Sequence, residues 1–161
     1  MSIRKAMGLA LAFTTCMGAL TLTAAPAQAE IAGACRIDVT LVEAGDIDEK
    51  GADEIRVRIG GNAYPGESSW VQMEARDRKS GSVFDDPSTV MNNNVGKSIA
   101  LIEVDPTFIL KNFELGTITV VPADCGNMQV GEVRDKQRRI QGTHTTFYSY
   151  LLNVRLTGLE A

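Results

Sequence analysis

Residues 52–61, Ala-Asp-Glu-Ile-Arg-Val-Arg-Ile-Gly-Gly, decide the fold class. Ile55, Val57 and Ile59 alternate with Arg56 and Arg58, which is the two-residue period of a β-strand with one face in a core and one in water. Acidic residues precede the alternation and a glycine pair closes it, as expected for a strand that follows a polar loop and ends in a tight turn. The stretch predicts an inner strand of an antiparallel sheet.

Further strand patterns follow on both sides of this stretch. They predict strands at 36–43, 69–76, 98–105, 116–122 and 143–156, and the nearly continuous apolar run at 98–105 predicts a strand covered on both faces. Composition predicts a loop at 85–97 and a polar excursion at 126–141, while 108–115 fits neither period well. Seven or eight strands and no convincing helix predict an all-β, antiparallel β-sandwich.

The first 29 residues have the pattern of a cleaved signal peptide. Arg4 and Lys5 form a positive start, residues 6–25 are mostly small and apolar, and Ala27-Gln28-Ala29 has the small-x-small pattern that signal peptidase accepts. Threonines interrupt the apolar run and no positive flank follows it, which argues against a membrane anchor. We therefore expect a secreted, extracellular protein that is not embedded in a membrane after cleavage.

Removal of the leader leaves one domain, residues 30–161. Taking 29 residues from 161 leaves 132, a size that suits one domain. The leader holds two of the 16 basic residues, so 14 remain against 20 acidic ones, a net charge of −6. A negative charge without a dense basic face argues against nucleic acid as a partner.

Two cysteines remain after cleavage, Cys35 and Cys125. In an exported protein an even pair is more often bridged than free, so we expect a disulfide that joins the two ends of the core. A catalytic thiol is the alternative, and His144, the only histidine, would then have to be its base.

The motifs of catalysis are missing from the sequence. It has no Gly-x-Ser-x-Gly elbow, His-Glu-x-x-His helix, Cys-x-x-Cys pair or phosphate-binding glycine loop. His144 lies between threonines and is better explained as a surface or hydrogen-bonded residue at a strand end than as a base or a zinc ligand. We therefore expect a protein that is not an enzyme and needs no cofactor.

Acidic residues near several strand ends suggest calcium as the one candidate ion. If the loops converge at one end of the sandwich, carboxylate oxygens could supply the six to eight ligands that Ca²⁺ takes. The alternative is a set of solvated acidic loops, because the spacing matches no calcium-loop consensus. The candidate ligands are Asp46, Asp48, Glu49, Asp53 and Asp105.

Three further features could serve binding. The basic run at 134–139 could steer an acidic partner, although it is more simply an exposed loop tip. Trp70, Tyr64, Tyr148 and Tyr150 could form a sugar-binding platform, although the alternation of the last two favours burial. A rigid loop at 63–68 could inhibit a protease. The candidate partner-binding residues are Glu30 and Ile31 of the N-terminal segment and Arg134, Lys136, Arg138 and Arg139 of the basic run.

A family resemblance rests on short motifs spread through the chain. Residues 53–58 followed by Gly60, then Trp70 and Met73, then Glu103-Val104-Asp105 and Leu115-Gly116, resemble a group of small exported actinobacterial β-sandwich proteins with a C2-like fold. The functional relative that the resemblance suggests is the adaptor subunit of the umbrella toxin particles of Streptomyces. There the adaptor links a lectin subunit to a large repeat-bearing toxin subunit, so the resemblance implies lectin-like and large repeat proteins as partners.

The sequence therefore favours one function class and leaves others open. The favoured class is a secreted, non-enzymatic protein-interaction module, an adaptor or structural subunit of an extracellular, toxin-like complex. The alternatives are a calcium- or carbohydrate-binding C2-like sandwich and a secreted protease inhibitor. Exposed apolar residues along an edge would favour the first class, and a convergent acidic cluster would favour the binding of a cation.

Overall fold

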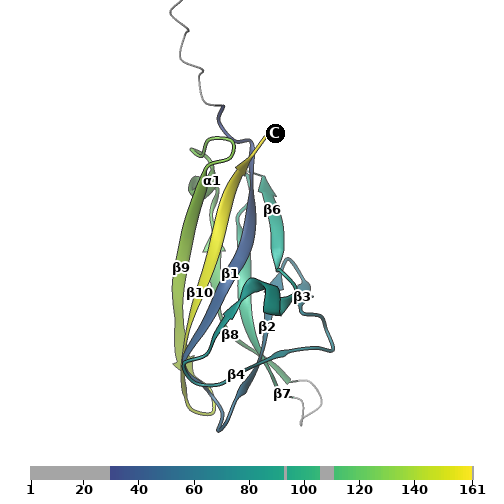
Figure 1. Cartoon of the computed structure of the whole chain (residues 1–161), viewed down its shortest axis with the longest axis vertical. Coiled ribbons are helices and arrows are strands. Elements are labelled where there is room, and N and C mark those ends of the chain that lie inside the picture. The colour runs from purple at the N-terminus through teal and green to yellow at the C-terminus, as the bar shows by residue number, and fades with distance from the viewer. Residues whose placement is uncertain (1–29, 93, 106–110, 161) are drawn as a thin grey trace, which may run out of the picture.

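The computed structural model describes residues 30–92, 94–105 and 111–160, and shows two antiparallel sheets packed face to face (Figure 1). The fold class predicted from the sequence is confirmed. The first sheet contains β1 (Ala34–Asp46), β5 (Arg78–Ser80), β6 (Ser88–Asn92), β9 (Val133–Thr143) and β10 (Phe147–Leu159). The second contains β2 (Asp53–Ile59), β3 (Asn62–Tyr64), β4 (Val71–Met73), β7 (Lys97–Asp105) and β8 (Lys111–Val120).

Long strands form the centre of each sheet. β1 and β10 pair from Ala34↔Leu159 to Asp46↔Ser149, and β9 continues this sheet beyond β10. The other side of β1 pairs first with β6 and then with β5, with the 3₁₀ turn η1 (Gly81–Phe84) between these two short strands. In the second sheet β2 pairs with β7, and β7 with β8.

Residues at alternating positions form the core between the sheets. Tyr148, Tyr150 and Leu152 of β10 are buried, together with Ile55 and Val57 of β2. This confirms the burial predicted for these positions from the two-residue period.

The outer face of the second sheet differs from the prediction for Arg56. Its side chain is only 1% exposed, its Nε donates a hydrogen bond to the Ser69 carbonyl, and its pairing partner on β7 is Ile102. With Ala100 and Val104, Ile102 forms a second small apolar cluster, so β7 is buried on both faces as predicted. The alternation predicted the strand correctly, but it could not show that the segment before β4 covers this face.

A disulfide joins Cys35 at the start of β1 to Cys125 in the one-turn helix α1 (Pro122–Cys125), with the two Cα atoms 5.9 Å apart. The predicted bridge is confirmed, and it indicates an oxidising compartment. The N-terminal residues of the described chain, its C-terminus and α1 lie at this same end of the sandwich (Figure 1). We call it the terminal end.

Several local expectations were wrong because short or polar strands carry a weak sequence signal. The described residues form ten strands where seven or eight were predicted, and β3, β4 and β5 have three residues each. The predicted loop at 85–97 contains β6, and the polar excursion at 126–141 contains most of β9, whose exposed charges hide its alternation. His144 lies in the turn between β9 and β10 rather than at the start of the last strand.

The predicted signal peptide lies outside the described residues, and so does part of the ambiguous segment at 108–115. Within the described part of the chain, no helix has the length and apolar character needed to cross a membrane.

Candidate functional sites

The end of the sandwich opposite the terminal end gathers acidic side chains and a histidine from three segments that are far apart in the sequence. Asp48 belongs to the loop between β1 and β2, Asp53 starts β2, Glu103 lies near the end of β7, and His144 lies in the turn from β9 to β10. Asp48, Asp53 and Glu103 are buried. We call these four residues the loop-end cluster.

Asp53 fixes the loop between β1 and β2. Its two carboxylate oxygens accept hydrogen bonds from the backbone N–H groups of Asp48 and Glu49, both at 2.9 Å, and one of them also accepts from the Tyr150 hydroxyl. Burial, the hydrogen bond to Asp53 and the negative charge nearby raise the pKa of Tyr150, so this hydroxyl stays a donor. Asp53 is therefore occupied in holding its own loop.

Asp48 connects this loop to the turn between β9 and β10. Its carboxylate accepts the backbone N–H groups of Thr145 at 3.0 Å and Thr146 at 2.8 Å, and its Oδ2 lies 2.8 Å from His144 Nδ1. Burial raises the pKa of Asp48, but the two backbone hydrogen bonds and His144 outweigh burial, so the pKa lies below its ordinary value. Asp48 therefore remains a carboxylate although it is buried.

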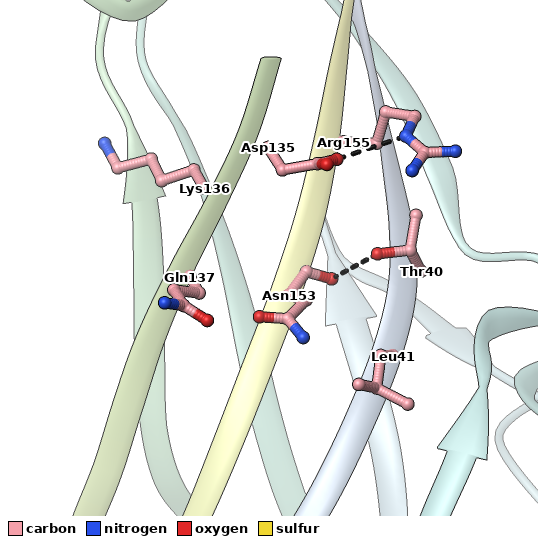
Figure 2. A pocket seen from close by; sticks show the side chains of 7 residues that line it. All are labelled: Thr40, Leu41, Asp135, Lys136, Gln137, Asn153 and Arg155. Carbon is pink, nitrogen blue, oxygen red and sulfur yellow. Dashed lines mark hydrogen bonds and ion pairs between the residues drawn. The ribbon is translucent and has the colours of Figure 1, made fainter. Parts of the chain in front are cut away.

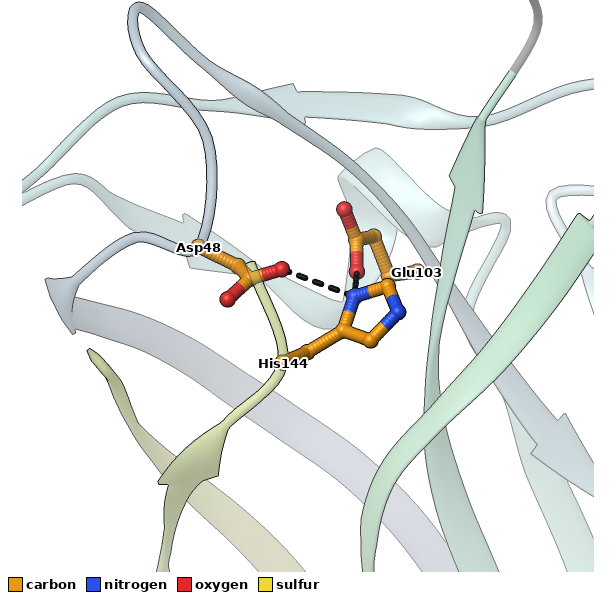
Figure 3. Close-up of side chains that lie close together, drawn as sticks. All are labelled: Asp48, Glu103 and His144. Carbon is orange, nitrogen blue, oxygen red and sulfur yellow. Dashed lines mark hydrogen bonds and ion pairs between the residues drawn. The ribbon is translucent and has the colours of Figure 1, made fainter. Parts of the chain in front are cut away.

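Glu103 is the residue of the cluster with an unmet hydrogen-bonding need. It is 3% exposed, and its Oε2 accepts no hydrogen bond and lies 3.4 Å from His144 Nδ1. Figure 3 shows the carboxylates of Asp48 and Glu103 both directed at this one ring nitrogen. Burial, followed by the charges of Asp53, Asp48 and Glu49, raises the pKa of Glu103 to about 7.

A hollow of about 530 Å³ opens beside this cluster. The ring of Phe113, which stacks on His144 with centroids 3.9 Å apart, forms part of its wall. The remaining lining residues are Glu49, Glu103, Asp105, Asn112, His144 and Thr145. Acidic and aromatic groups thus face the same space.

The predicted calcium ligands are only partly brought together. Asp48 and Asp53 meet in the cluster, and Glu49 and Asp105 line the hollow. Asp46 is exposed at the end of β1, where it pairs with Ser149, and it does not line the hollow. The loops converge as the calcium hypothesis required, while calcium binding itself stays a prediction.

The proximity of Glu103 and His144 was not predicted from the sequence. The signal for Glu103 was its place between apolar neighbours, Ile102 and Val104, in a run that was predicted to be buried on both faces. A carboxylate in such a strand must find a partner or lose its charge. No sequence pattern indicated the role of His144. Its contacts are with Asp48 and Glu103, which lie 96 and 41 positions earlier in the chain and come beside it only in the folded structure.

A second surface lies on the outer face of the first sheet (Figure 2). A groove of about 440 Å³ crosses β9, β10 and β1. Asp135 and Arg155 form an ion pair at 3.1 Å in it, and Thr40 donates a hydrogen bond to the Asn153 carbonyl. The other lining residues are Leu41, Lys136 and Gln137. A neighbouring hollow that reaches η1 shares Thr40 and Arg155 with this groove, and we call the two hollows together the trough.

The predicted partner-binding residues of the basic run fall on β9 and have different surroundings. Arg134 bonds to Glu132 and to the carbonyls of Asp124 and Asn127, which fixes it to the α1 segment. The ammonium group of Lys136 donates to Asp124 and to the Thr119 carbonyl of β8. Both side chains therefore hold the terminal end together.

The remaining predicted partner-binding residues are more exposed. Arg138 and Arg139 are exposed on β9, and Arg139 reaches Ser149 at 3.1 Å. Glu30 is exposed, and Ile31, 70% exposed, forms an isolated bridge with Gln129. Binding of a partner by any of the six residues stays a prediction.

The two alternative binding surfaces predicted from the sequence were an aromatic sugar-binding platform and an inhibitory loop at 63–68. Tyr148 and Tyr150 are buried, as the alternation predicted, so the four aromatic residues do not form one exposed platform. The loop at 63–68 leads up to Ser69, whose carbonyl is held by Arg56. Inhibition of a protease by this loop stays a prediction.

Comparison with known proteins gives a likeness of fold and no family. No protein-family model and no curated protein matches the chain. Among solved structures, it is similar to CC2D1B, a protein active during the mitotic reformation of the nuclear envelope, with a TM-score of 0.47, 10% identity and coverage of 78% of this chain and 55% of that chain. It is also similar to a C2 domain of plant extended synaptotagmin 1, with a TM-score of 0.43, 10% identity and coverage of 82% of this chain and 99% of that chain.

Both TM-scores lie below 0.5, so these likenesses carry no conclusion about the family or the role of this chain. The chain spans about half the length of the CC2D1B chain. At this level of similarity no function follows from either structure.

Proposed function

We propose that this chain is an exported, non-enzymatic protein-interaction module that binds an extended polar segment of another secreted protein along β9. The observation that carries the proposal is the coincidence of an edge strand with the trough. β9 has 11 residues and, among the described strands, pairs only with β10. An edge strand offers backbone groups for β-augmentation, and side-chain hollows beside it supply specificity.

The chemistry of the trough defines the partner. Asp135 and Arg155 present both signs of charge, and the side-chain amides of Gln137 and Asn153 can donate and accept hydrogen bonds. Such a surface suits a polar segment of mixed charge rather than a lipid or a nucleic acid. Exposed charges on β9 also protect the edge from indiscriminate pairing, because a charged edge resists aggregation.

The finer role that we propose is that of an adaptor or structural subunit of an extracellular, toxin-like complex. Its support is the sequence resemblance to small exported actinobacterial sandwich proteins. The disulfide is consistent with an oxidising compartment outside the cytoplasm. A disulfide-bonded sandwich with a separate binding face suits such a subunit, because it can present that face without a change of fold.

Affinity capture from the medium of the producing cells tests this function. We expect the tagged mature chain to retain a partner in stoichiometric amount. Charge reversal Arg155→Glu should reduce the capture by about tenfold or more, since a charge placed against a like charge opposes association. Recovery of the chain alone would contradict the proposal.

Two matched variants separate a lost surface from a damaged fold. The exchange Asp135→Arg with Arg155→Asp keeps an ion pair between β9 and β10 but inverts its orientation towards a partner, so capture should remain weak. Gln72→Lys places a charge at an exposed position of β4, in the second sheet and outside the trough, and should leave capture unchanged. Equal capture by all the variants would show that the partner binds elsewhere.

A further inference from the structure

The loop-end cluster places one nitrogen and two carboxylates from three different segments around a common point. The Nδ1 atom of His144 and one oxygen each of Asp48 and Glu103 lie within 4.8 Å of one another. The three side chains converge from the loop after β1, from β7 and from the turn after β9 (Figure 3). A convergence of this kind does not follow from an acidic loop being solvated, because Asp48 and Glu103 are buried.

The hydrogen bonds within the cluster leave one buried carboxylate oxygen without a donor. The Nδ1 of a neutral imidazole carries at most one proton, and Asp48 at 2.8 Å takes the shorter contact with it. Glu103 Oε2, which is buried, accepts no hydrogen bond, and the other charged groups closest to it include the carboxylates of Asp53 and Glu49. A buried oxygen in this situation opposes folding unless a cation or a proton satisfies it.

From this geometry we propose that Asp48, Glu103 and His144 form a binding site for a divalent transition-metal ion of the zinc type, coordinated by two carboxylates and one imidazole. Imidazole nitrogen is a ligand of zinc, copper, iron and nickel, whereas calcium takes oxygen ligands. The histidine therefore distinguishes this site from the oxygen-only calcium site suggested by the sequence.

The distances fit a tetrahedral ion after a small adjustment. Metal–ligand bonds of about 2.1 Å place two ligand atoms about 3.4 Å apart at a tetrahedral centre. Glu103 Oε2 and His144 Nδ1 are 3.4 Å apart. Asp48 Oδ2 and His144 Nδ1 are 2.8 Å apart, so their hydrogen bond must open and the proton must leave as the ion enters.

The surroundings of the three ligands hold them in place. Thr145 and Thr146 donate backbone N–H groups to Asp48, and Phe113 stacks on the imidazole ring. Groups that orient metal ligands in this way strengthen binding. The hollow beside the cluster gives the fourth position access to water or to an external carboxylate or amine, so three protein ligands are sufficient.

Titration of the untagged, disulfide-bonded protein with ZnCl₂ after chelation tests the site, with CaCl₂ titrated in parallel. We expect one zinc ion per chain and no comparable binding of calcium. Glu103→Gln and His144→Gln should each weaken zinc binding by about 100-fold or more. Asp46→Asn, which removes an exposed carboxylate outside the hollow, should leave it unchanged.

A second measurement keeps the test valid if a variant does not fold. The chain has a single histidine, so the imidazole signals in a nuclear magnetic resonance spectrum of the wild-type protein need no assignment. Zinc should shift them, and Co²⁺ in place of zinc should give visible absorption from a nitrogen- and oxygen-bound ion. Zinc binding without a change at the imidazole, tighter binding of calcium than of zinc, or no binding of zinc would each overturn the proposal.

Discussion

The two ends of the sandwich are held together by different means. At the terminal end a covalent bond between Cys35 and Cys125 ties β1 to α1, and partly exposed ion pairs such as that of Lys136 with Asp124 lie around it. At the loop end, no disulfide joins the described loops, and buried carboxylates hold them by accepting backbone N–H groups. Among the described residues, the first arrangement leaves no buried side-chain nitrogen or oxygen without a hydrogen bond, whereas the second leaves Glu103 Oε2 without one.

This difference suggests a division of roles. A disulfide constrains the chain whatever the ionic conditions, so the terminal end serves stability. A buried carboxylate cluster costs free energy unless a cation or donors compensate it. The loop end is therefore the region in which stability and ligand binding are expected to oppose one another, and the predictions below compare the two ends on that basis.

Removal of the disulfide should have the largest effect. The bridge spans 90 residues, and the chain-entropy model gives a crosslink of this length about 4.6 kcal/mol of stabilisation. Cys35→Ala with Cys125→Ala should therefore lower the free energy of unfolding by an amount near this value, as measured in urea. A loss below about 1 kcal/mol would show that the ion pairs hold the terminal end without the bridge.

Removal of one buried hydroxyl tests the carboxylate network of the loop end. Tyr150→Phe takes a hydrogen bond away from Asp53 and should lower the free energy of unfolding by about 2 kcal/mol. Tyr148→Phe is the matched control, because its hydroxyl donates to the neutral Leu115 carbonyl at 2.9 Å, and it should cost about 1 kcal/mol. Equal losses would contradict a special contribution from the charged acceptor.

Asp124 offers a pH-dependent test at the terminal end. Burial raises its pKa, but hydrogen bonds from Lys136 and from the Val121 N–H outweigh burial, so the pKa lies below its ordinary value of 3.8. Its contribution is present above pH 3.8 and lost as the pH falls through the lower, folded-state pKa. Asp124→Asn should cost about 1 kcal/mol at pH 7 and progressively less in urea titrations below about pH 4.

The absence of such a trend for Asp124→Asn would show that the neutral amide replaces the carboxylate in both contacts. An additional loss at low pH would contradict the sign of the pKa shift. Either result would leave the disulfide as the main constraint on α1.

The smallest effect is expected at an exposed ion pair. Arg36 and Asp38 lie on β1 near the disulfide, 2.8 Å apart, with both side chains partly exposed. Solvent and salt screen such a pair, so Asp38→Asn should change the free energy of unfolding by less than about 0.5 kcal/mol. Unfolding in urea at low and high salt measures it, and a loss above about 1 kcal/mol would indicate that the pair belongs to a larger network.

The sequence predicted those parts of the fold that depend on local periodicity. The alternation in β2 and β10 predicted their buried faces, and export with two remaining cysteines predicted the bridge. β9 was missed because five of its eleven residues are charged and obscure its alternation, and the covering of Arg56 was missed because it depends on a distant carbonyl. Local patterns do not record contacts of this kind.

The candidate site shows the same limit. Acidic residues at strand ends predicted that a cluster would form, and Asp48 and Asp53 belong to it. Their contacts with Thr145, Thr146 and Tyr150 depend on the pairing of β1 with β10, which no local pattern specifies. The role of Glu103 follows from the lack of a hydrogen bond to its buried Oε2, which is a property of the packed structure.

The most direct test of this division of roles compares the wild-type protein with Glu103→Gln at neutral pH, first with a chelator and then with saturating zinc. The free energy of unfolding is measured in urea for all four samples. The variant should be the more stable protein in chelator, because it removes a buried carboxylate from among Asp48, Asp53 and Glu49. With zinc the order should reverse, because ligand binding stabilises the native state. An order that is the same in both conditions would contradict the central claim that Glu103 is retained for a ligand.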